Sequence, residues 1–309
     1  MKNIYKSGLI LMVILLVSSC SKKGCTDPMS LAYNIDASKD DGSCTYPENS
    51  KKTLVFNSTG TWCQYCGDWG KTFSDDLTND FANDVQIITL HANDDFSVDV
   101  GYSMQSHLDN IHGPTGVPHF YLGTADVPNN YNQLVSAVTA DLLLSPDVNM
   151  DFNFNVVDGK MNINVQSELS NGFTSDNLYL ATYILEDGQV KDQNVLGNYD
   201  PNYIHDNILR TEASGSGSAF GSLIEFDANG RNLTSYSDVA LAPSSLWNHD
   251  NLYVVAVIWE FDGSDYRLVN VEKYSYKFIF LKATSSSFFF GLEILFIELK
   301  FCFFRSISS

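Results

Sequence analysis

The chain has 309 residues, 44% of them hydrophobic, and this length is enough for about two domains with cores of their own. Lysine and arginine number 18 against 37 aspartates and glutamates, which gives a formal net charge of −19. So acidic a surface repels phosphate backbones and anionic lipid head groups. The composition therefore argues against nucleic-acid binding and against membrane docking by charge alone.

Residues 1–19 have the features of a secretory signal peptide. Lys2 and Lys6 precede an apolar run that is too short for a comfortable membrane-spanning helix. Small residues then lead to Cys20 in the string V-S-S-C, which is typical of a lipobox, whose cysteine is lipidated and becomes the new N-terminus. We predict an exported protein anchored to a membrane by its lipid chains. Ordinary cleavage nearby or an uncleaved signal anchor is the alternative.

Residues 20–49 form a short acidic segment in which Cys25 and Cys44 are the remaining cysteines. In an oxidising compartment this pair is expected to form a structural disulfide, worth about 3 kcal/mol for a loop of this length. We predict a disulfide-closed spacer. A weak calcium site is the minority interpretation, since the spacing does not fit an EF-hand loop. Its candidate ligands are Asp36, Asp40 and Asp41.

The next segment leads from a predicted strand to a pair of cysteines. Residues 53–56 are a predicted buried strand, and a Ser/Thr/Gly turn leads from it to the string W-C-Q-Y-C at residues 62–66, at the expected start of a helix. This order resembles the arrangement found in thioredoxins. The free N–H groups and positive dipole end of a helix N-terminus stabilise a thiolate at Cys63, the predicted attacking thiol. Two intervening residues place Cys66 within disulfide reach, where it resolves a mixed disulfide.

A second thioredoxin signature follows further along the chain. Residues 113–122 contain a T-G-V-P string followed by an apolar strand, which matches the thioredoxin cis-proline loop. There Pro118 lies beside the disulfide, and backbone groups are free to pair with an extended substrate chain. The two motifs in this order predict a redox site whose catalytic members are Cys63, Cys66 and Pro118. The predicted rim around the site consists of Trp62, Tyr65 and Val117.

Two alternative roles for the cysteine pair stay open. One is a purely structural disulfide on a degenerate thioredoxin fold. The second is zinc binding, which would need two further ligands. The nearby histidines have the spacing of no familiar zinc module, so we predict no metal and no cofactor. These histidines are His91, His107, His112 and His119.

Asn57 sets this site apart from thioredoxin itself. Asn57 stands six residues before Cys63, where thioredoxins place a buried carboxylate that helps to deprotonate the second cysteine. An amide cannot take that proton. An asparagine at this place is familiar from extracytoplasmic, membrane-tethered thioredoxin-like proteins. His91 ends the predicted strand 85–90, where it either lies near the site or is an ordinary loop residue.

From residue 148 the pattern changes to alternating apolar and polar residues. Asp158-Gly159 and Asp262-Gly263 each lie between two such segments, which is typical of β-hairpins. We predict an all-β sandwich over residues 148–277, with the function of a spacer or of a binding domain.

Two further segments differ in composition from the predicted strands. Residues 191–250 are rich in Asn, Gly and Ser, which predicts long loops with short strands. Residues 278–309 contain nine of the twenty phenylalanines, together with the lone Cys302. We interpret this tail as a non-native extension, with a membrane-associating segment as the alternative.

The order of these parts resembles the twenty-eight-kilodalton outer-membrane protein family, which are lipoproteins of the Bacteroidetes outer membrane. The segment Tyr203–Arg210 is similar to the family's H-x-x-V-L-R segment. The resemblance implies an α/β thioredoxin-like domain over residues 50–147, followed by an all-β sandwich, in a protein lipid-anchored to the outer membrane. Lys22 and Lys23 differ from the acidic export signals of surface lipoproteins in that group, which favours the periplasmic face over the surface.

Together these patterns predict a membrane-anchored, extracytoplasmic thiol–disulfide oxidoreductase. Its partners would be the thiols or disulfides of exported proteins. The alternative is an outer-membrane or surface binding lipoprotein, in which the thioredoxin-like domain is a scaffold and the sandwich holds the partner.

Overall fold

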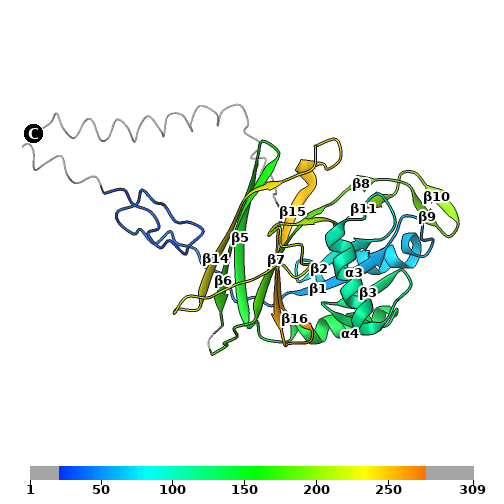
Figure 1. The fold of residues 1–309 in the computed structure, drawn as a ribbon, viewed down its shortest axis with the longest axis horizontal. Coiled ribbons are helices and arrows are strands. Elements are labelled where there is room, and N and C mark those ends of the chain that lie inside the picture. Colours follow the sequence, from blue (N-terminus) through cyan, green and yellow to red (C-terminus); the bar gives the residue numbers. More distant parts are fainter. Residues whose placement is uncertain (1–20, 171, 276–309) are drawn as a thin grey trace, which may run out of the picture. The chain divides into compact units, whose positions relative to one another are not determined.

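The computed structural model describes residues 21–170 and 172–275. The predicted signal peptide, the lipidation site Cys20 and the Phe-rich tail lie outside the described residues. Strands predominate in the described part and α-helices lie beside some of them, so the fold is mixed α/β, as the sequence predicts (Figure 1). Among these residues, no helix combines the length and hydropathy needed to cross a bilayer.

One nine-stranded sheet includes residues from most of the described chain. Its strands are β1 (Thr53–Thr59), β2 (Val85–His91), β3 (His119–Leu122), β4 (Ala125–Val127), β7 (Leu178–Glu186), β12 (Ile208–Glu212), β13 (Ser222–Leu223), β15 (Leu252–Phe261) and β16 (Tyr266–Ser275). The order is β16-β15-β7-β12-β2-β1-β3-β4, with β13 attached to β7. β1 is parallel to β2 and antiparallel to β3. The two strands that flank the cysteine motif, β1 and β2, are therefore neighbours inside the sheet and not at its edge.

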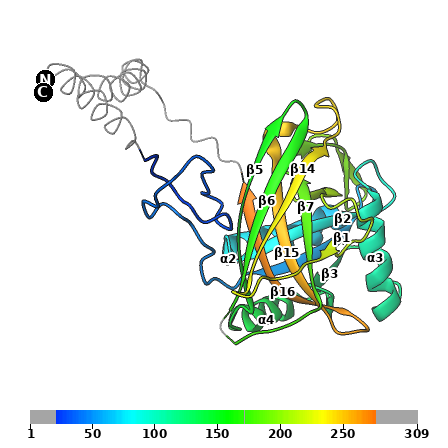
Figure 2. The ribbon, with the colours of Figure 1, turned by 60° about the vertical axis from the view of Figure 1, so that its left-hand side comes forward.

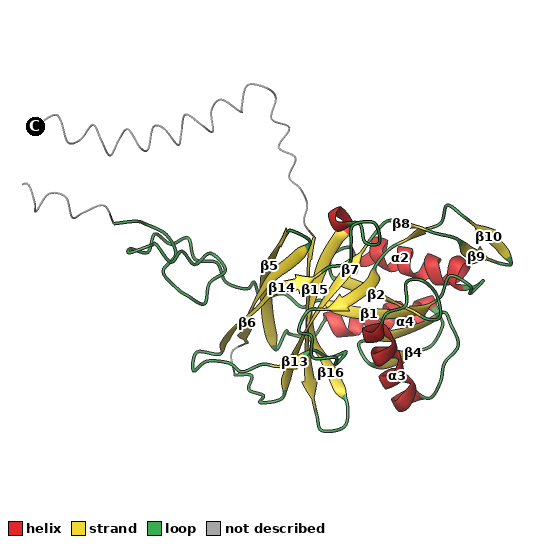
Figure 3. Ribbon diagram, turned by 45° about the horizontal axis from the view of Figure 1, so that its top comes forward, coloured by secondary structure: helices red, strands yellow, loops and turns green. Residues whose placement is uncertain are grey.

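Helices cover both faces of strands β1–β4 (Figure 3). The α-helices are α2 (Lys71–Phe81), α3 (Asp99–His112) and α4 (Tyr131–Leu142). Side chains alternate between the two faces of a strand, so Val55 packs with α2 and α4 in one core while Phe56 packs with α3 in another. The core that contains Phe56 continues into the C-terminal half of the chain. The Phe56 ring stacks on that of Trp259, with 6.3 Å between the ring centroids.

Strand β12 joins the two halves of the chain within the sheet. It lies beside β2 in parallel orientation, with Ile208 opposite Thr89, and pairs with β7 on its other side. The Thr89 amide donates a hydrogen bond of 2.9 Å to the carbonyl oxygen of Asn207. The outer edge of β2 is therefore covered by a strand from more than a hundred residues later in the sequence.

A second sheet of three strands packs on the C-terminal part of the large one (Figure 2). It consists of β5 (Val148–Val157), β6 (Lys160–Leu169) and β14 (Arg231–Ala240), in the order β14-β6-β5. Phe152 and Ile163 from this sheet share a buried core with Ile184 and Val254 from the large one. Both residues of the β5–β6 turn, Asp158-Gly159, have positive φ, as a type I′ hairpin turn requires.

Residues 191–250, predicted to contain long loops and short strands, do contain them but also include the ten-residue strand β14. The short elements in and beside this region include β8 (Gln189–Val190), β9 (Gln193–Val195), β10 (Asn198–Asp200), β11 (Ile204–His205) and the 3-10 turn η2 (His249–Asn251). β9 and β10 form a hairpin, and β11 pairs with β8. The hairpin lies beside the cysteine motif, as described below.

The spacer is closed by a Cys25–Cys44 disulfide. Each carboxylate of the suggested calcium site has a local partner: Asp36 pairs with Lys22, and Asp40 and Asp41 accept from nearby backbone amides. Within the described ranges, no group of three or more His, Cys, Asp or Glu side chains is arranged to hold a metal ion.

Candidate redox site

The cysteine pair lies where β1 passes into its following helix. Cys63 and Cys66 form a disulfide with a Cα–Cα distance of 5.3 Å, and each is about 5% exposed. The Cys63 amide donates to the Gly60 carbonyl, which closes the turn after β1. The Cys66 amide points at Cys63 Sγ, 3.1 Å away. This donor is the kind of group that stabilises a thiolate on Cys63 once the disulfide opens.

The helix after the motif differs from the expected regular α-helix. It begins as a π-helical turn, η1 (Cys66–Gly70), and continues as α2. The Gly70 amide donates to the Tyr65 carbonyl at 3.0 Å in this turn. A Cβ on Gly70 would lie 2.9 Å from Pro118 Cβ, so glycine is what lets the helix approach the proline loop this closely. Such π-helical turns often occur at functional sites.

The proline loop meets the cysteines from the side of β3. The Val117–Pro118 peptide bond is cis, and the Val117 carbonyl oxygen lies 3.5 Å from Cys63 Sγ. The structure thus brings together Cys63, Cys66 and Pro118, the three residues predicted to form the site.

The predicted rim is the accessible part of the site. Trp62 is 47% exposed and Tyr65 is 49% exposed, whereas Val117 is half-buried. The Trp62 indole is held by a hydrogen bond of 2.8 Å from Nε1 to the Ala92 carbonyl. The cysteines are therefore buried beneath a rim of exposed aromatic side chains.

The hairpin β9–β10, which no sequence pattern predicted, holds the cysteine loop. Gln193 Nε2 donates to the Cys63 carbonyl at 2.9 Å, and the Asn194 and Leu196 amides donate to the carbonyls of Thr61 and Gln64. The one local signal is Gly67, where a Cβ would lie 2.6 Å from the Asn194 carbonyl oxygen. A glycine at this position is consistent with a close backbone approach, but the sequence does not indicate which segment approaches it.

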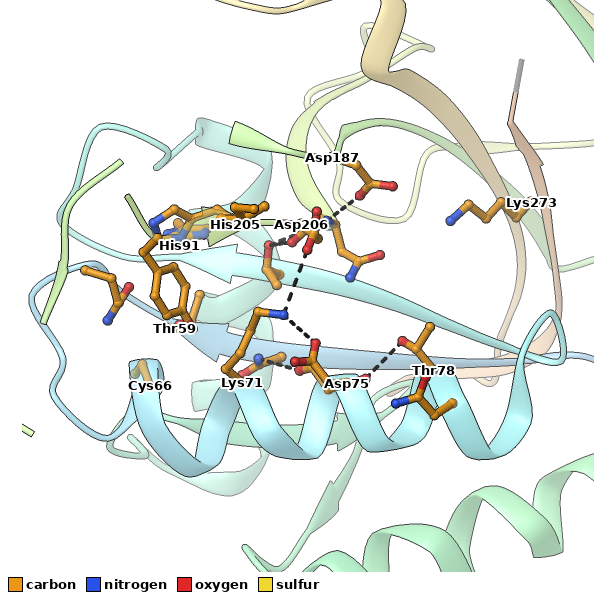
Figure 4. Close-up of a pocket in the computed structure, with 18 residues that line it drawn as sticks. Thr59, Cys66, Lys71, Asp75, Thr78, His91, Asp187, His205, Asp206 and Lys273 are labelled. Atoms are coloured by element: carbon orange, nitrogen blue, oxygen red, sulfur yellow. Dashed lines mark hydrogen bonds and ion pairs between the residues drawn. The ribbon is translucent and has the colours of Figure 1, made fainter. Parts of the chain in front are cut away.

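A polar cavity of about 370 Å³ lies behind Cys66 and takes its walls from both halves of the chain (Figure 4). Asn57, 5% exposed, lines it and donates from Nδ2 to Ser74 Oγ at 3.0 Å. Asn57 Oδ1 is buried without a hydrogen-bond partner in the described part of the chain. The amide predicted to replace a carboxylate therefore stands in the wall of the cavity that Cys66 faces.

The charged groups of this cavity largely pair with one another. Lys71 on α2 contacts Asp75, and its Nζ lies 3.9 Å from Asp206. Lys273 Nζ lies 4.0 Å from the centre of the Tyr253 ring. Burial lowers the pKa of Lys273, an effect that the nearby Asp187 opposes, and burial likewise raises the pKa of Asp187.

His91 is placed on the wall of this cavity (Figure 4). Its Nδ1 lies 2.8 Å from Asp94 Oδ2, and its ring contacts that of His205 at 5.8 Å between centroids. Burial, aided by His91, lowers the pKa of His205 to about 4. The other three histidines considered as zinc ligands lie elsewhere with partners of their own: His107 contacts Asp265, His112 the Thr124 carbonyl and His119 Asp126.

Comparison with solved structures places the fold among known ones. HBP35 of Porphyromonas gingivalis superposes with a TM-score of 0.60 at 14% identity, over 74% of this chain and 76% of that one. A domain of the outer membrane lipoprotein Omp28 from the same organism matches at 18% identity, over 42% of this chain and 88% of that one, with a TM-score of 0.28. A comparison with curated proteins finds no match.

Fold and site together define a mixed α/β protein with a buried Cys-x-x-Cys disulfide beside a cis-proline loop. The profile of the Omp28 outer membrane protein family matches residues 105–277, which is more than half of the chain. The protein belongs to this family, and its location is the outer membrane of the cell envelope. The matched region begins in α3, so it includes Pro118 and the hairpin β9–β10 but not the two cysteines.

Proposed function

We propose that this protein is a lipid-anchored outer-membrane protein that carries out thiol–disulfide exchange with exported proteins. The observation that carries the proposal is the arrangement at Cys63: its sulfur lies between the Cys66 amide and the Val117 carbonyl. In this interpretation residues 50–147 are a thioredoxin-like domain, residues 148–277 are the β-sandwich, and Cys20 carries the lipid. The two lysines after Cys20 support the periplasmic face.

The exchange has two steps that are reversible as a whole. In the reducing direction, the Cys63 thiolate attacks a substrate disulfide, forms a mixed disulfide and releases one substrate thiolate. Cys66 then attacks Cys63 Sγ, which restores the Cys63–Cys66 disulfide and releases the second substrate thiolate. A dithiol reductant must then reopen the pair. In the oxidising direction, a substrate thiolate attacks Cys63 and the same steps run backwards.

Three features of the geometry support this role. The backbone carbonyl of Val117 at the proline loop offers a hydrogen-bond acceptor to an extended substrate chain passing Cys63. Trp62 and Tyr65 provide exposed aromatic surface next to the disulfide. Cys66, which lines the cavity, suits the resolving role.

The reduction potential of Cys63–Cys66 tests the proposal. The full chain, kept free of lipid by Cys20→Ser, is equilibrated with defined glutathione or dithiothreitol ratios, and each disulfide is followed by alkylation and peptide mass spectrometry. A potential of about −120 to −180 mV indicates an oxidant or isomerase, and about −270 mV a reductant. A potential below about −300 mV identifies a structural disulfide and overturns the proposal. The Cys25–Cys44 pair in the same sample is the internal reference.

A second candidate function is partner binding, with the cysteine pair as a structural element. It is supported by the family match, which includes the sandwich strands and leaves the cysteines out. The variant Cys63→Ser/Cys66→Ser separates the two functions. Retention of all biological activity by this variant supports binding, and its loss supports exchange.

A further inference from the structure

We propose that His91, oriented by Asp94, exchanges the proton of Cys66 during thiol–disulfide exchange. The inference rests on the proposed function, because it assigns a proton acceptor to the resolving step of that reaction. It starts from the cavity behind Cys66, where a buried histidine and the buried sulfur line the same space (Figure 4).

The first observation is the position of His91. It is the last residue of β2, and its register partner on β1 is Thr59, at the end from which the chain turns to the cysteine motif. Its side chain is only 3% exposed, so the imidazole is held by the protein and does not rotate freely in solvent. The cavity of about 370 Å³ that both His91 and Cys66 line has room for a water that relays a proton.

The second observation is that Asp94 sets the tautomer of His91. Asp94 accepts hydrogen bonds from the amides of Thr61 and Phe96, both at 2.9 Å, as well as contacting His91 Nδ1. Burial raises the pKa of Asp94, but hydrogen bonds from His91 and the two amides outweigh it and hold that pKa below its usual value. An ionised carboxylate only accepts, so His91 Nδ1 carries the proton.

His91 Nε2 is then an acceptor in the neutral ring. No described residue forms a hydrogen bond with Nε2, and the ring lines the cavity that contains Cys66. Because Thr61 belongs to the turn that leads to Cys63, Asp94 connects the histidine directly to the cysteine loop. Asp94 is thus a positioning residue for both.

The other groups that line the cavity are less suited to the task. Asn57 is an uncharged amide, and His205 uses its Nε2 on the Lys191 carbonyl at 3.2 Å. The remaining titratable groups around His91 and Cys66 come from α2, the β7–β8 turn, β11 and its flanks, and β16. They are Lys71 and Asp75, Asp187, Tyr203 and Asp206, and Lys273. Of these, Lys71, Asp75 and Asp206 contact one another.

The proposed step is balanced as follows. The Cys66 thiol gives its proton through a water to His91 Nε2, and the Cys66 thiolate attacks Cys63 Sγ in the mixed disulfide. The Cys63–Cys66 bond forms, and the bond between Cys63 and the substrate sulfur breaks. Cys66 is oxidised, the substrate sulfur is reduced and leaves as a thiolate, and the proton on His91 passes to it through solvent. In the oxidising direction, protonated His91 returns the proton to the leaving Cys66 thiolate.

The test separates the two chemical steps. The full chain with Cys20→Ser is reduced with dithiothreitol, freed of it, and mixed with oxidised glutathione. Acid quenching and mass spectrometry then follow formation of the Cys63–glutathione mixed disulfide and its resolution by Cys66. Cys66→Ala, which stops at the mixed disulfide, calibrates the first step.

His91→Gln is expected to slow resolution about 100-fold at pH 7 while leaving mixed-disulfide formation within about twofold. The rate at which His91→Gln resolves the mixed disulfide should also keep rising in proportion to the hydroxide concentration. The wild-type rate should instead level off over the same pH range. A purely structural role for His91 would not change that pH profile. His107→Asn, which alters a histidine outside the cavity, is the matched control and should change neither step.

Equal resolution rates and pH profiles in the wild type and His91→Gln would overturn the inference while leaving the proposed function intact. Failure of the wild type to form any mixed disulfide would overturn the proposed function itself. If His91→Gln does not fold, Asp94→Asn takes its place. That variant retains an oxygen acceptor for the Thr61 amide but removes the charge that orients His91, and it should slow resolution with the same pH signature.

Discussion

Gln193 Nε2 donates a hydrogen bond of 2.9 Å to the carbonyl oxygen of Cys63, which lies 130 residues earlier in the chain. The same amide group also reaches the Gly60 carbonyl at 3.3 Å, and the Gln193 side chain is almost wholly buried. The cysteine loop is therefore held on one side by the proline loop and on the other by a hairpin from the C-terminal half.

Gln193→Ala should loosen this loop. The Cys63 carbonyl loses this buried donor, whereas the Gly60 carbonyl keeps the Cys63 amide, and an unsatisfied buried polar group costs about 1–3 kcal/mol. We expect a loss of this size in the free energy of unfolding from urea denaturation, together with faster reduction of Cys63–Cys66 by dithiothreitol. Gln133→Ala, at an exposed site on α4, is the control and should stay within about 0.5 kcal/mol of wild type. An unchanged reduction rate in Gln193→Ala would contradict the holding role of the hairpin.

Gly70→Ala should push the helix away from the proline loop, because its Cβ would lie 2.9 Å from Pro118 Cβ. Overpacking of this kind costs about 1–3 kcal/mol. We expect lower thermal stability and slower exchange with oxidised glutathione. Gly116→Ala is the matched control, since a Cβ there meets nothing within 4 Å. Equal behaviour of the two variants would show that the close approach at Gly70 is unimportant.

Because His205 has a lowered pKa in the folded protein, we expect the protein to lose stability in mild acid. The pKa of His205 in the folded protein is about 4, below the ordinary 6.5, so the unfolded chain binds more protons between these values. The free energy of unfolding should therefore fall as the pH drops from about 6.5 to 4, by at most about 3 kcal/mol. Urea titrations of the wild type and His205→Asn at pH 7 and pH 4.5 measure the effect. A pH slope that is the same in both would assign the loss to other groups.

Arg210 and Glu186 form a buried ion pair, with an Nη2–Oε2 distance of 2.7 Å and side chains 5% and 0% exposed. Arg210→Met leaves the Glu186 carboxylate buried without its cation, which should cost about 3–5 kcal/mol. The double variant Arg210→Met/Glu186→Gln removes the charge as well and should recover part of that loss. Denaturation of both variants checks this, and a double variant less stable than the single one would refute it.

The local parts of the site could be predicted from the sequence because short spacings determine them. Cys63, Cys66 and Pro118 belong to two compact motifs, and the Asp158-Gly159 turn is specified by its own two residues. The same holds for the strands beside these motifs, whose apolar patterns are continuous. Each of these predictions needs interactions over only a few residues.

The parts that could not be predicted depend on pairings between distant segments. Nothing in the polar sequence around Gln193 indicates that its side chain forms a hydrogen bond with the Cys63 carbonyl. In the same way, the sequence around Ile208 does not indicate that this residue pairs with Thr89 in the sheet. The close approach of Gly70, in the π-helical start of the helix, to Pro118 is likewise a tertiary contact. The role of His91 depends on Asp94 and on a cavity whose walls come from both halves of the chain.

The place of β12 beside β2 has a consequence for how the protein reaches its folded state during export. A chain translocated only as far as residue 200 has no strand to cover the outer edge of β2, and the hairpin that holds the cysteine loop is barely complete. Until Glu212 has crossed the membrane, that edge presents unpaired backbone groups to any neighbouring chain. The cysteines thus emerge well before the segments that surround them in the folded protein.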